Sequence, residues 1–106
     1  MGLEEPLKAA VESLAGTVRL ALVYGSVTSR MDTSASDVDL LIVADELTLE
    51  DVYAALSTAE QLLDRKVNPT LYTSEEFDRR RARGNAFPNR VLSGPVIVLS
   101  ETIDDE

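Results

Sequence analysis

Two short motifs in the first half of the chain carry the residue types that metal-assisted phosphate chemistry needs. Gly25 and Ser26 follow an apolar run, and Asp37 and Asp39 lie at the start of another. Residues i and i+2 of a strand point to the same side, so the two aspartates are expected to present their carboxylates on one face. Carboxylates this close repel each other unless a cation neutralises them, and their hard oxygens suit Mg²⁺ or Mn²⁺.

The Gly-Ser pair predicts an anion site beside these carboxylates. Gly25 allows a ligand to approach the backbone closely. If a helix begins at Ser26, its free N–H groups and its hydroxyl form a site suited to phosphate. A phosphate site next to a carboxylate pair is what metal-assisted phosphoryl or nucleotidyl transfer requires. Either motif alone is usually a turn or the start of a strand, so the prediction depends on their combination.

The composition restricts the remaining chemistry. The chain of 106 residues contains no cysteine and no histidine, which excludes disulfides, cysteine or histidine metal ligands, and catalysis by a thiolate or an imidazole. Its formal net charge is −9, so nonspecific binding to nucleic acid or to anionic membranes is not expected. No apolar run approaches the ~20 residues of a membrane helix, and the first residues lack a signal-peptide pattern. The expected location is the cytoplasm.

Four runs rich in β-branched and aliphatic residues predict the strands that must position the motifs. The run that contains Asp39 is apolar on both faces, which predicts a central strand. Pro69 cannot donate a ladder hydrogen bond and therefore places its strand at an edge or at a bulge. The predicted strands cover residues 17–24, 37–44, 67–72 and 95–99.

Apolar residues at helical spacing predict helices around these strands. Capping-box patterns at Thr48 and Thr73 mark the starts of two of them. Because helices and strands alternate, the predicted fold class is α/β, or α+β, with a small mixed sheet of about four strands flanked by helices. The helices are expected over residues 4–14, 48–63 and 73–84, in one domain of residues 1–106 with a core over about 14–99 and an acidic tail over 101–106.

In this order the motifs resemble a known signature. Val23–Ser26 (VYGS), followed after a polar connection by Ser36–Val43 (SDVDLLIV), is similar to the Gly-Ser and Asp-x-Asp motif of the DNA polymerase beta superfamily of nucleotidyltransferases. The short chain points to the minimal nucleotidyltransferase branch of that superfamily. The resemblance covers about residues 14–99 and is specific between residues 24 and 43.

The resemblance implies a nucleotidyltransferase fold and the transfer of a nucleoside monophosphate from an NTP, commonly ATP, to a hydroxyl acceptor. It implies Mg²⁺ or Mn²⁺ on the catalytic carboxylates Asp37 and Asp39, and phosphates on Gly25 and Ser26, with Ser36 in the same phosphate-binding set. Minimal members resemble antitoxins that inactivate small helical toxins by adding AMP to a tyrosine, so a partner protein of that kind is one expected acceptor. A homodimer is also compatible with the sequence.

One position departs from the superfamily pattern. The full metal site of the superfamily adds a third carboxylate from a neighbouring strand, and here Asn68 occupies that place. An amide oxygen can bind a cation weakly, but it is neutral and cannot accept a proton from the nucleophile. Asp64 is an alternative ligand, although the surface end of the preceding helix is its expected place. The rivals to an enzyme are therefore a catalytically weakened nucleotide-binding or protein-interaction module of the same fold, and a plain structural domain.

Arginines supply the other candidate contacts. Arg30 lies between the two motifs, where it either reaches the triphosphate or remains solvated in a loop. Arg79, Arg80, Arg81 and Arg83 form a basic cluster. A solvated helix face balanced by neighbouring acids is the preferred interpretation of the cluster, and contact with a phosphate-bearing substrate or a partner is the alternative.

Overall fold

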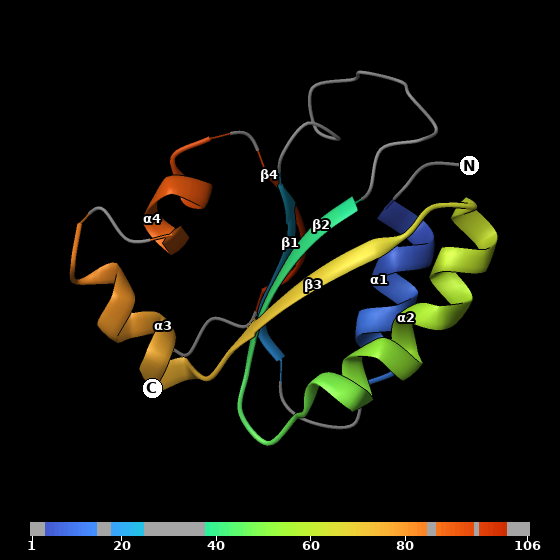
Figure 1. Cartoon of the computed structure of the whole chain (residues 1–106), viewed down its shortest axis with the longest axis horizontal. Coiled ribbons are helices and arrows are strands. Elements are labelled where there is room, and N and C mark those ends of the chain that lie inside the picture. Colours follow the sequence, from blue (N-terminus) through green and yellow to red (C-terminus); the bar gives the residue numbers. More distant parts are fainter. Residues whose placement is uncertain (1–3, 15–17, 25–37, 85–86, 95, 102–106) are drawn as a thin grey trace.

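The fold is a four-stranded sheet with two helices on each face (Figure 1), as a computed structural model shows for residues 4–14, 18–24, 38–84, 87–94 and 96–101. This architecture confirms the predicted fold class. The strands are β1 (Val18–Tyr24), β2 (Val38–Ala44), β3 (Val67–Tyr72) and β4 (Val96–Glu101). The helices are α1 (Glu4–Glu12), α2 (Leu49–Leu63), α3 (Ser74–Arg81) and α4 (Phe87–Leu92).

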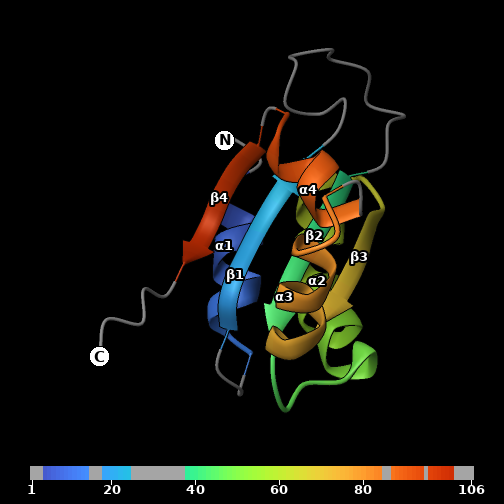
Figure 2. The same cartoon turned by 90° about the vertical axis from the view of Figure 1, so that its left-hand side faces the viewer.

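The strand directions bring the two sequence motifs toward the same end of the sheet. The strands lie in the order β3-β2-β1-β4, with β1 antiparallel to both β2 and β4, and with β2 parallel to β3. The last residue of β1 and the first residues of the other three strands therefore share one end, which we call the motif end. In Figure 2, α4 lies near the motif end and α3 lies farther along the same face.

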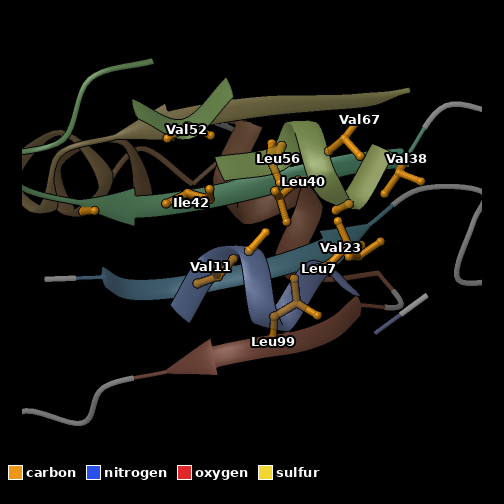
Figure 3. Packing of buried hydrophobic residues seen from close by; sticks show 14 residues of the cluster. Leu7, Val11, Val23, Val38, Leu40, Ile42, Val52, Leu56, Val67 and Leu99 are labelled. Carbon is orange, nitrogen blue, oxygen red and sulfur yellow. The ribbon is translucent and has the colours of Figure 1, made fainter. Parts of the chain in front are cut away.

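The central strand β2 is buried on both faces, as its apolar run predicts. Leu40, Leu41, Ile42 and Val43 expose none of their surface. A strand that is apolar on both sides can be buried only if helices cover both faces of its sheet. The helices α1 and α2 cover one face, where the larger core cluster lies (Figure 3), and α3 and α4 cover the other, where the smaller cluster lies.

The edge position predicted from Pro69 is confirmed, because β3 is the last strand on its side of the sheet. The Val38 N–H donates to the carbonyl oxygen of Lys66 at 2.9 Å. By alternation along the ladder, the backbone nitrogens of Val67 and Pro69 then face away from β2. The Val67 N–H donates to Glu60 Oε2 at 2.7 Å, and Pro69 has no N–H. The outer side of β3 is thus a poor template for a further strand.

One helix and three element ends differ from the sequence-based predictions. The short helix α4 has no counterpart among the predicted helices, because its six residues are too few to show helical periodicity. The helices predicted to reach residues 14 and 84 end earlier, at Glu12 and Arg81. Glu101, expected in the acidic tail, pairs with Leu20 of β1 as the last residue of β4. Among the described residues, no helix is long and apolar enough to cross a membrane.

Truncation of the central strand should destabilise the protein strongly. Leu40→Ala leaves a cavity between the sheet and its helices, so we expect the free energy of unfolding to fall by about 2–5 kcal/mol. Leu62→Ala is the matched control, because Leu62 on α2 is 57% exposed, and its expected effect is within about 0.5 kcal/mol. Urea denaturation followed by circular dichroism measures both. Similar losses in the two variants would contradict the burial of β2.

Candidate functional site

Tyr24, Asp39 and Asn68 form one row across three strands at the motif end. Asp39 of β2 is paired in the Cα register with Tyr24 of β1 on one side and with Asn68 of β3 on the other. Directly opposed residues of neighbouring strands place their side chains on the same face. Because neighbouring strands lie about 4.8 Å apart, the carboxylate of Asp39 and the amide of Asn68 are close enough to share one cation.

The row lies on the face that α3 and α4 cover. Leu41 of β2 and Tyr72 of β3 belong to the core cluster beneath these helices. Asp39 precedes Leu41 by two residues and Asn68 precedes Tyr72 by four, so strand alternation places both on this face. Asp39 is the one residue of β2 that is not fully buried, and Asn68 is also half-buried. A ligand can therefore reach polar atoms at the end of an otherwise closed strand.

The phenol of Tyr24 is the third member of the row. Burial raises the pKa of Tyr24, a hydrogen bond with the side chain of Thr70 lowers the pKa, and the negative charge of Asp39 raises it again. The net result is a pKa above the usual 10.0, so the phenol keeps its proton at neutral pH. The ring also meets Phe87 of α4 edge-on, with 5.6 Å between ring centroids and 76° between planes.

The structure brings two of the predicted metal ligands together, Asp39 and Asn68. Asp64 does not join them, because it ends α2 in the left-handed conformation (φ 56°) and is exposed, as expected. Within the described part of the chain, no three acidic side chains come close enough to hold a metal ion. The remaining predicted site residues lie outside the described residues: Gly25, Ser26, Arg30, Ser36 and Asp37.

One arginine of the basic cluster, Arg80, joins α3 to the sheet. Arg80 Nη2 lies 3.1 Å from Glu76 Oε2, and the Arg80 guanidinium lies over the Tyr72 ring at 5.4 Å from its centroid. The Arg81 guanidinium lies over the Phe77 ring at 5.9 Å. These contacts agree with the interpretation of the cluster as a balanced helix face.

A surface groove among the described residues lies away from the row. It is found at the C-terminal end of α2, which covers the opposite face of the sheet. The groove is open, and charges of both signs line it, so it is not a closed pocket. Its lining residues are Ser57, Glu60, Gln61, Asp64, Arg65 and Lys66. We therefore place the candidate site at the row and not at this groove.

The sequence analysis did not include Tyr24 in the site. Its place in the row depends on the strand order, because Tyr24 and Asn68 lie on strands that are separated by β2. A signal was nevertheless present, since Tyr24 is the last residue before the Gly-Ser motif. A side chain at the end of that strand must lie beside whichever strand carries the Asp-x-Asp motif.

No family model and no curated protein sequence matches the chain. Solved structures do match it. A chain of a mutant toxin–antitoxin complex, MntA-HpeT, aligns with a TM-score of 0.60 and 13% identity over 96% of this chain and 75% of its own length. A toxin–antitoxin structure with AMP-PNP aligns with a TM-score of 0.63 and 16% identity over 93% and 73%. This chain has the nucleotidyltransferase fold of these two structures.

A third match is a candidate nucleotidyltransferase from Sulfolobus solfataricus, with 21% identity over 73% of this chain and 72% of its own length. Its TM-score of 0.45 is too low to define a shared fold. In the nucleotidyltransferase fold of this chain, the row of Tyr24, Asp39 and Asn68 begins where β1 leads into the Gly-Ser motif.

Alkaline titration of Tyr24 tests the geometry of the row. The difference between the absorbance titrations of the wild type and Tyr24→Phe should be one ionisation step above pH 10.0. Thr70→Val should move this step to higher pH because it removes the hydrogen bond, and Asp39→Asn should move it to lower pH because it removes the negative charge.

Stability should follow the same linkage. The pKa of Tyr24 is higher in the folded state than in the unfolded state. Its contribution to the free energy of unfolding is therefore fully present below the unfolded pKa of about 10, and it is lost as the pH rises through the folded pKa. An ionisation step at or below pH 10.0, or one that Asp39→Asn leaves unmoved, would contradict the row.

Proposed function

We propose that the chain is a divalent-metal nucleotidyltransferase that transfers a nucleoside monophosphate from an NTP, ATP in the first place, to a hydroxyl group of a partner protein. The observation that carries this proposal is the register that sets Asp39 beside Asn68. This pair lies at the end of the sheet where β1 leads into Gly25 and where Asp37 leads into β2. The same proposal places the protein in the cytoplasm.

The residues present fit a hard divalent cation. Asp39 and Asn68 offer oxygen atoms from neighbouring strands, and Asp37 supplies a second carboxylate. Magnesium is usually bound through one or two carboxylates together with substrate phosphates, and it keeps several water molecules. Asp37 and Asp39 would therefore hold Mg²⁺ or Mn²⁺, with Asn68 as a weak neutral ligand. When bound, the cation polarises the phosphate oxygens and offsets the charge of the triphosphate.

The Gly-Ser motif and its neighbours bind the triphosphate in this proposal. Gly25 and Ser26 supply backbone N–H groups and a hydroxyl, Ser36 supplies another hydroxyl, and Arg30 pairs with phosphate oxygens. In the reaction, the acceptor oxygen forms a bond to the α-phosphorus. The bond from the α-phosphorus to the bridging oxygen breaks, and pyrophosphate leaves.

The fate of the acceptor proton separates this site from one with three carboxylates. The amide of Asn68 cannot take the proton, because it is not basic. Tyr24 cannot take it either, because its raised pKa keeps the phenol protonated at neutral pH. The proton therefore passes to water, and the transfer is slow compared with that of an enzyme with a carboxylate in the place of Asn68.

The similar solved structures support the choice of partner and nucleotide. Both are toxin–antitoxin structures, and one of them contains AMP-PNP, an ATP analogue. The mutant of MntA-HpeT replaces two aspartates, separated by one residue, with glutamates. Asp37 and Asp39 have the same spacing in this chain. A small helical toxin-like protein is therefore the proposed acceptor.

A second candidate function is favoured by Asn68 alone. A module that keeps nucleotide affinity but acts through protein contacts needs no third carboxylate. Such a module would bind ATP without releasing pyrophosphate, whether asparagine or aspartate stands at position 68.

Replacement of Asn68 by aspartate should increase catalysis. Asn68→Asp restores a group that can bind metal and accept the proton, and a general base is worth 100-fold or more. We expect pyrophosphate release from ATP with Mg²⁺ to rise by about 100-fold in Asn68→Asp and to disappear in Asp39→Asn. Transfer of label from α-labelled ATP to protein is followed in parallel. ATP binding without release in both the wild type and Asn68→Asp would favour the non-catalytic module.

Magnesium should stabilise the folded protein through Asp39. A cation at about ten times its Kd adds about 1.4 kcal/mol of stability, which corresponds to about 5–10 °C in the melting temperature of a domain of this size. Asp39→Asn should remove this shift, because it removes a negative ligand. Asp64→Asn is the matched control and should retain the shift, since Asp64 lies at the exposed end of α2. Equal shifts in the two variants would count against the site.

A further inference from the structure

The strand β4 forms the second edge of the sheet. It is the last strand on the side of β1, and Figure 2 shows it at the margin of the molecule with no described helix beyond it. Its residues Val96–Ser100 carry no charge. The outer side of β3 is guarded by Glu60 and Pro69, whereas the outer side of β4, which we call the β4 edge, has no such guard among the described residues.

The hydrogen-bond ladder determines which backbone groups point toward the β4 edge. Backbone N–H and C=O groups alternate in direction along a strand. The Val38 N–H donates to Lys66 on the side of β3, so the backbone groups of Asp39 point the other way, toward Tyr24 of β1. The backbone groups of the next residue of β1, Val23, therefore point toward β4.

Val23 is paired with Ile97, so the N–H and C=O of Ile97 bond to β1. On either side of Ile97, Val96 and Val98 turn these groups to the β4 edge. Within the described part of the chain, no strand lies on that side. After Val98 the register shifts by one residue, at a bulge that includes Leu99, and a bulge interrupts regular pairing. The segment open to pairing is therefore Val96–Val98.

This segment is held in place from two directions. Its strand pairs with β1 from Val96 to Glu101. Leu99 is only 4% exposed and belongs to the larger core cluster together with Leu7 of α1 (Figure 3). A strand that is already ordered loses little conformational entropy when another strand pairs with it.

The segment is also complementary to itself. If two antiparallel copies of β4 are centred on Ile97, Val96 of each copy lies opposite Val98 of the other, and each of these pairs exchanges two backbone hydrogen bonds. Val98 is 49% exposed in the single chain, and this register gives its side chain a β-branched neighbour on the same face. On the opposite face, Ile97 lies against Ile97 of the second copy. The two copies of Glu101 lie at opposite ends of the pair and do not meet.

We propose that the protein forms a two-fold homodimer, in which the β4 edges of two copies pair antiparallel through Val96–Val98 and join the two sheets into one. A second copy fits the edge because the segment matches itself in sequence and direction. Association stops at two copies, since on the outer side of β3 the Val67 N–H is bonded to Glu60 and Pro69 has no N–H.

The dimer leaves both candidate sites accessible. Because β4 starts at the motif end and the two copies are antiparallel, the two motif ends lie at opposite ends of the joined sheet. Each copy keeps its own Asp39 and Asn68. The dimer needs neither metal nor nucleotide, so it goes beyond the proposed function and can be tested without it.

Sedimentation equilibrium of the full chain tests the dimer. The wild type should change from 11.5 kDa to twice this mass as its concentration rises from about 1 μM to about 1 mM, as a small interface requires. Val98→Pro should weaken the dimer by about 30-fold, because it removes one outward N–H from each copy and so two hydrogen bonds. Each chain should still fold, since an edge strand accepts proline where the N–H faces solvent.

Two further variants of Val98 complete the test. Val98→Thr is the matched control, because it keeps the N–H and the β-branched shape, and it should leave the dimer within about threefold of the wild type. Val98→Lys should weaken the dimer even if Val98→Pro fails to fold, because lysine on an edge strand opposes pairing. A wild type that stays monomeric at about 1 mM, or a dimer that neither Val98→Pro nor Val98→Lys weakens, would overturn the proposal.

Amide hydrogen exchange locates the interface. The Val96 and Val98 amides should exchange more slowly as the protein concentration rises, whereas the Ile97 amide should be protected at every concentration because it bonds to β1. Exchange at Val98 that does not depend on concentration would refute pairing at the β4 edge, even if the chain dimerises through another surface. Protection of Val98 only when a different protein is added would also refute it and would assign the edge to a strand of that protein.

Discussion

The register of β2 between its two neighbours is the constraint on which the rest of the structure depends. Its apolar side chains must fill two cores at once, one beneath α1 and α2 and the other beneath α3 and α4. A slip of one residue would turn Asp39 into the larger core and remove Leu40 from it. A buried carboxylate without a partner is costly, so the packing of β2 also sets the face and the position of Asp39.

The same register explains why a polar row can exist beside a closed core. The row lies at the motif end, where β1 stops and β2 and β3 start, so polar side chains can remain half-buried there. Tyr24 packs against the core cluster that contains Leu41 and Phe77. The helices α3 and α4 contribute to the site mainly through packing, because Phe87 of α4 contacts the ring of Tyr24 edge-on.

Much of this architecture could be predicted from local patterns. The apolar run after Asp39 predicts a central strand, Pro69 predicts an edge strand, and the capping box at Thr48 predicts the start of α2, all of which the structure confirms. The helix α4 was missed because six residues are too few to show helical periodicity, and the strand position of Glu101 was missed because it depends on pairing with Leu20 of β1. The place of Tyr24 opposite Asp39 could not be predicted without the strand order, since it depends on which strands are neighbours.

The central claim is that the row of Asp39 and Asn68 is the metal-binding part of a nucleotidyl-transfer site. A crystal structure of the full chain with Mn²⁺ and a non-hydrolysable ATP analogue, with anomalous data that locate the manganese, tests it most directly. We expect a manganese peak about 2.1 Å from a carboxylate oxygen of Asp39, on the face that α3 and α4 cover. No peak at the row, or manganese bound instead between Glu60 and Asp64 in the groove of α2, would contradict it.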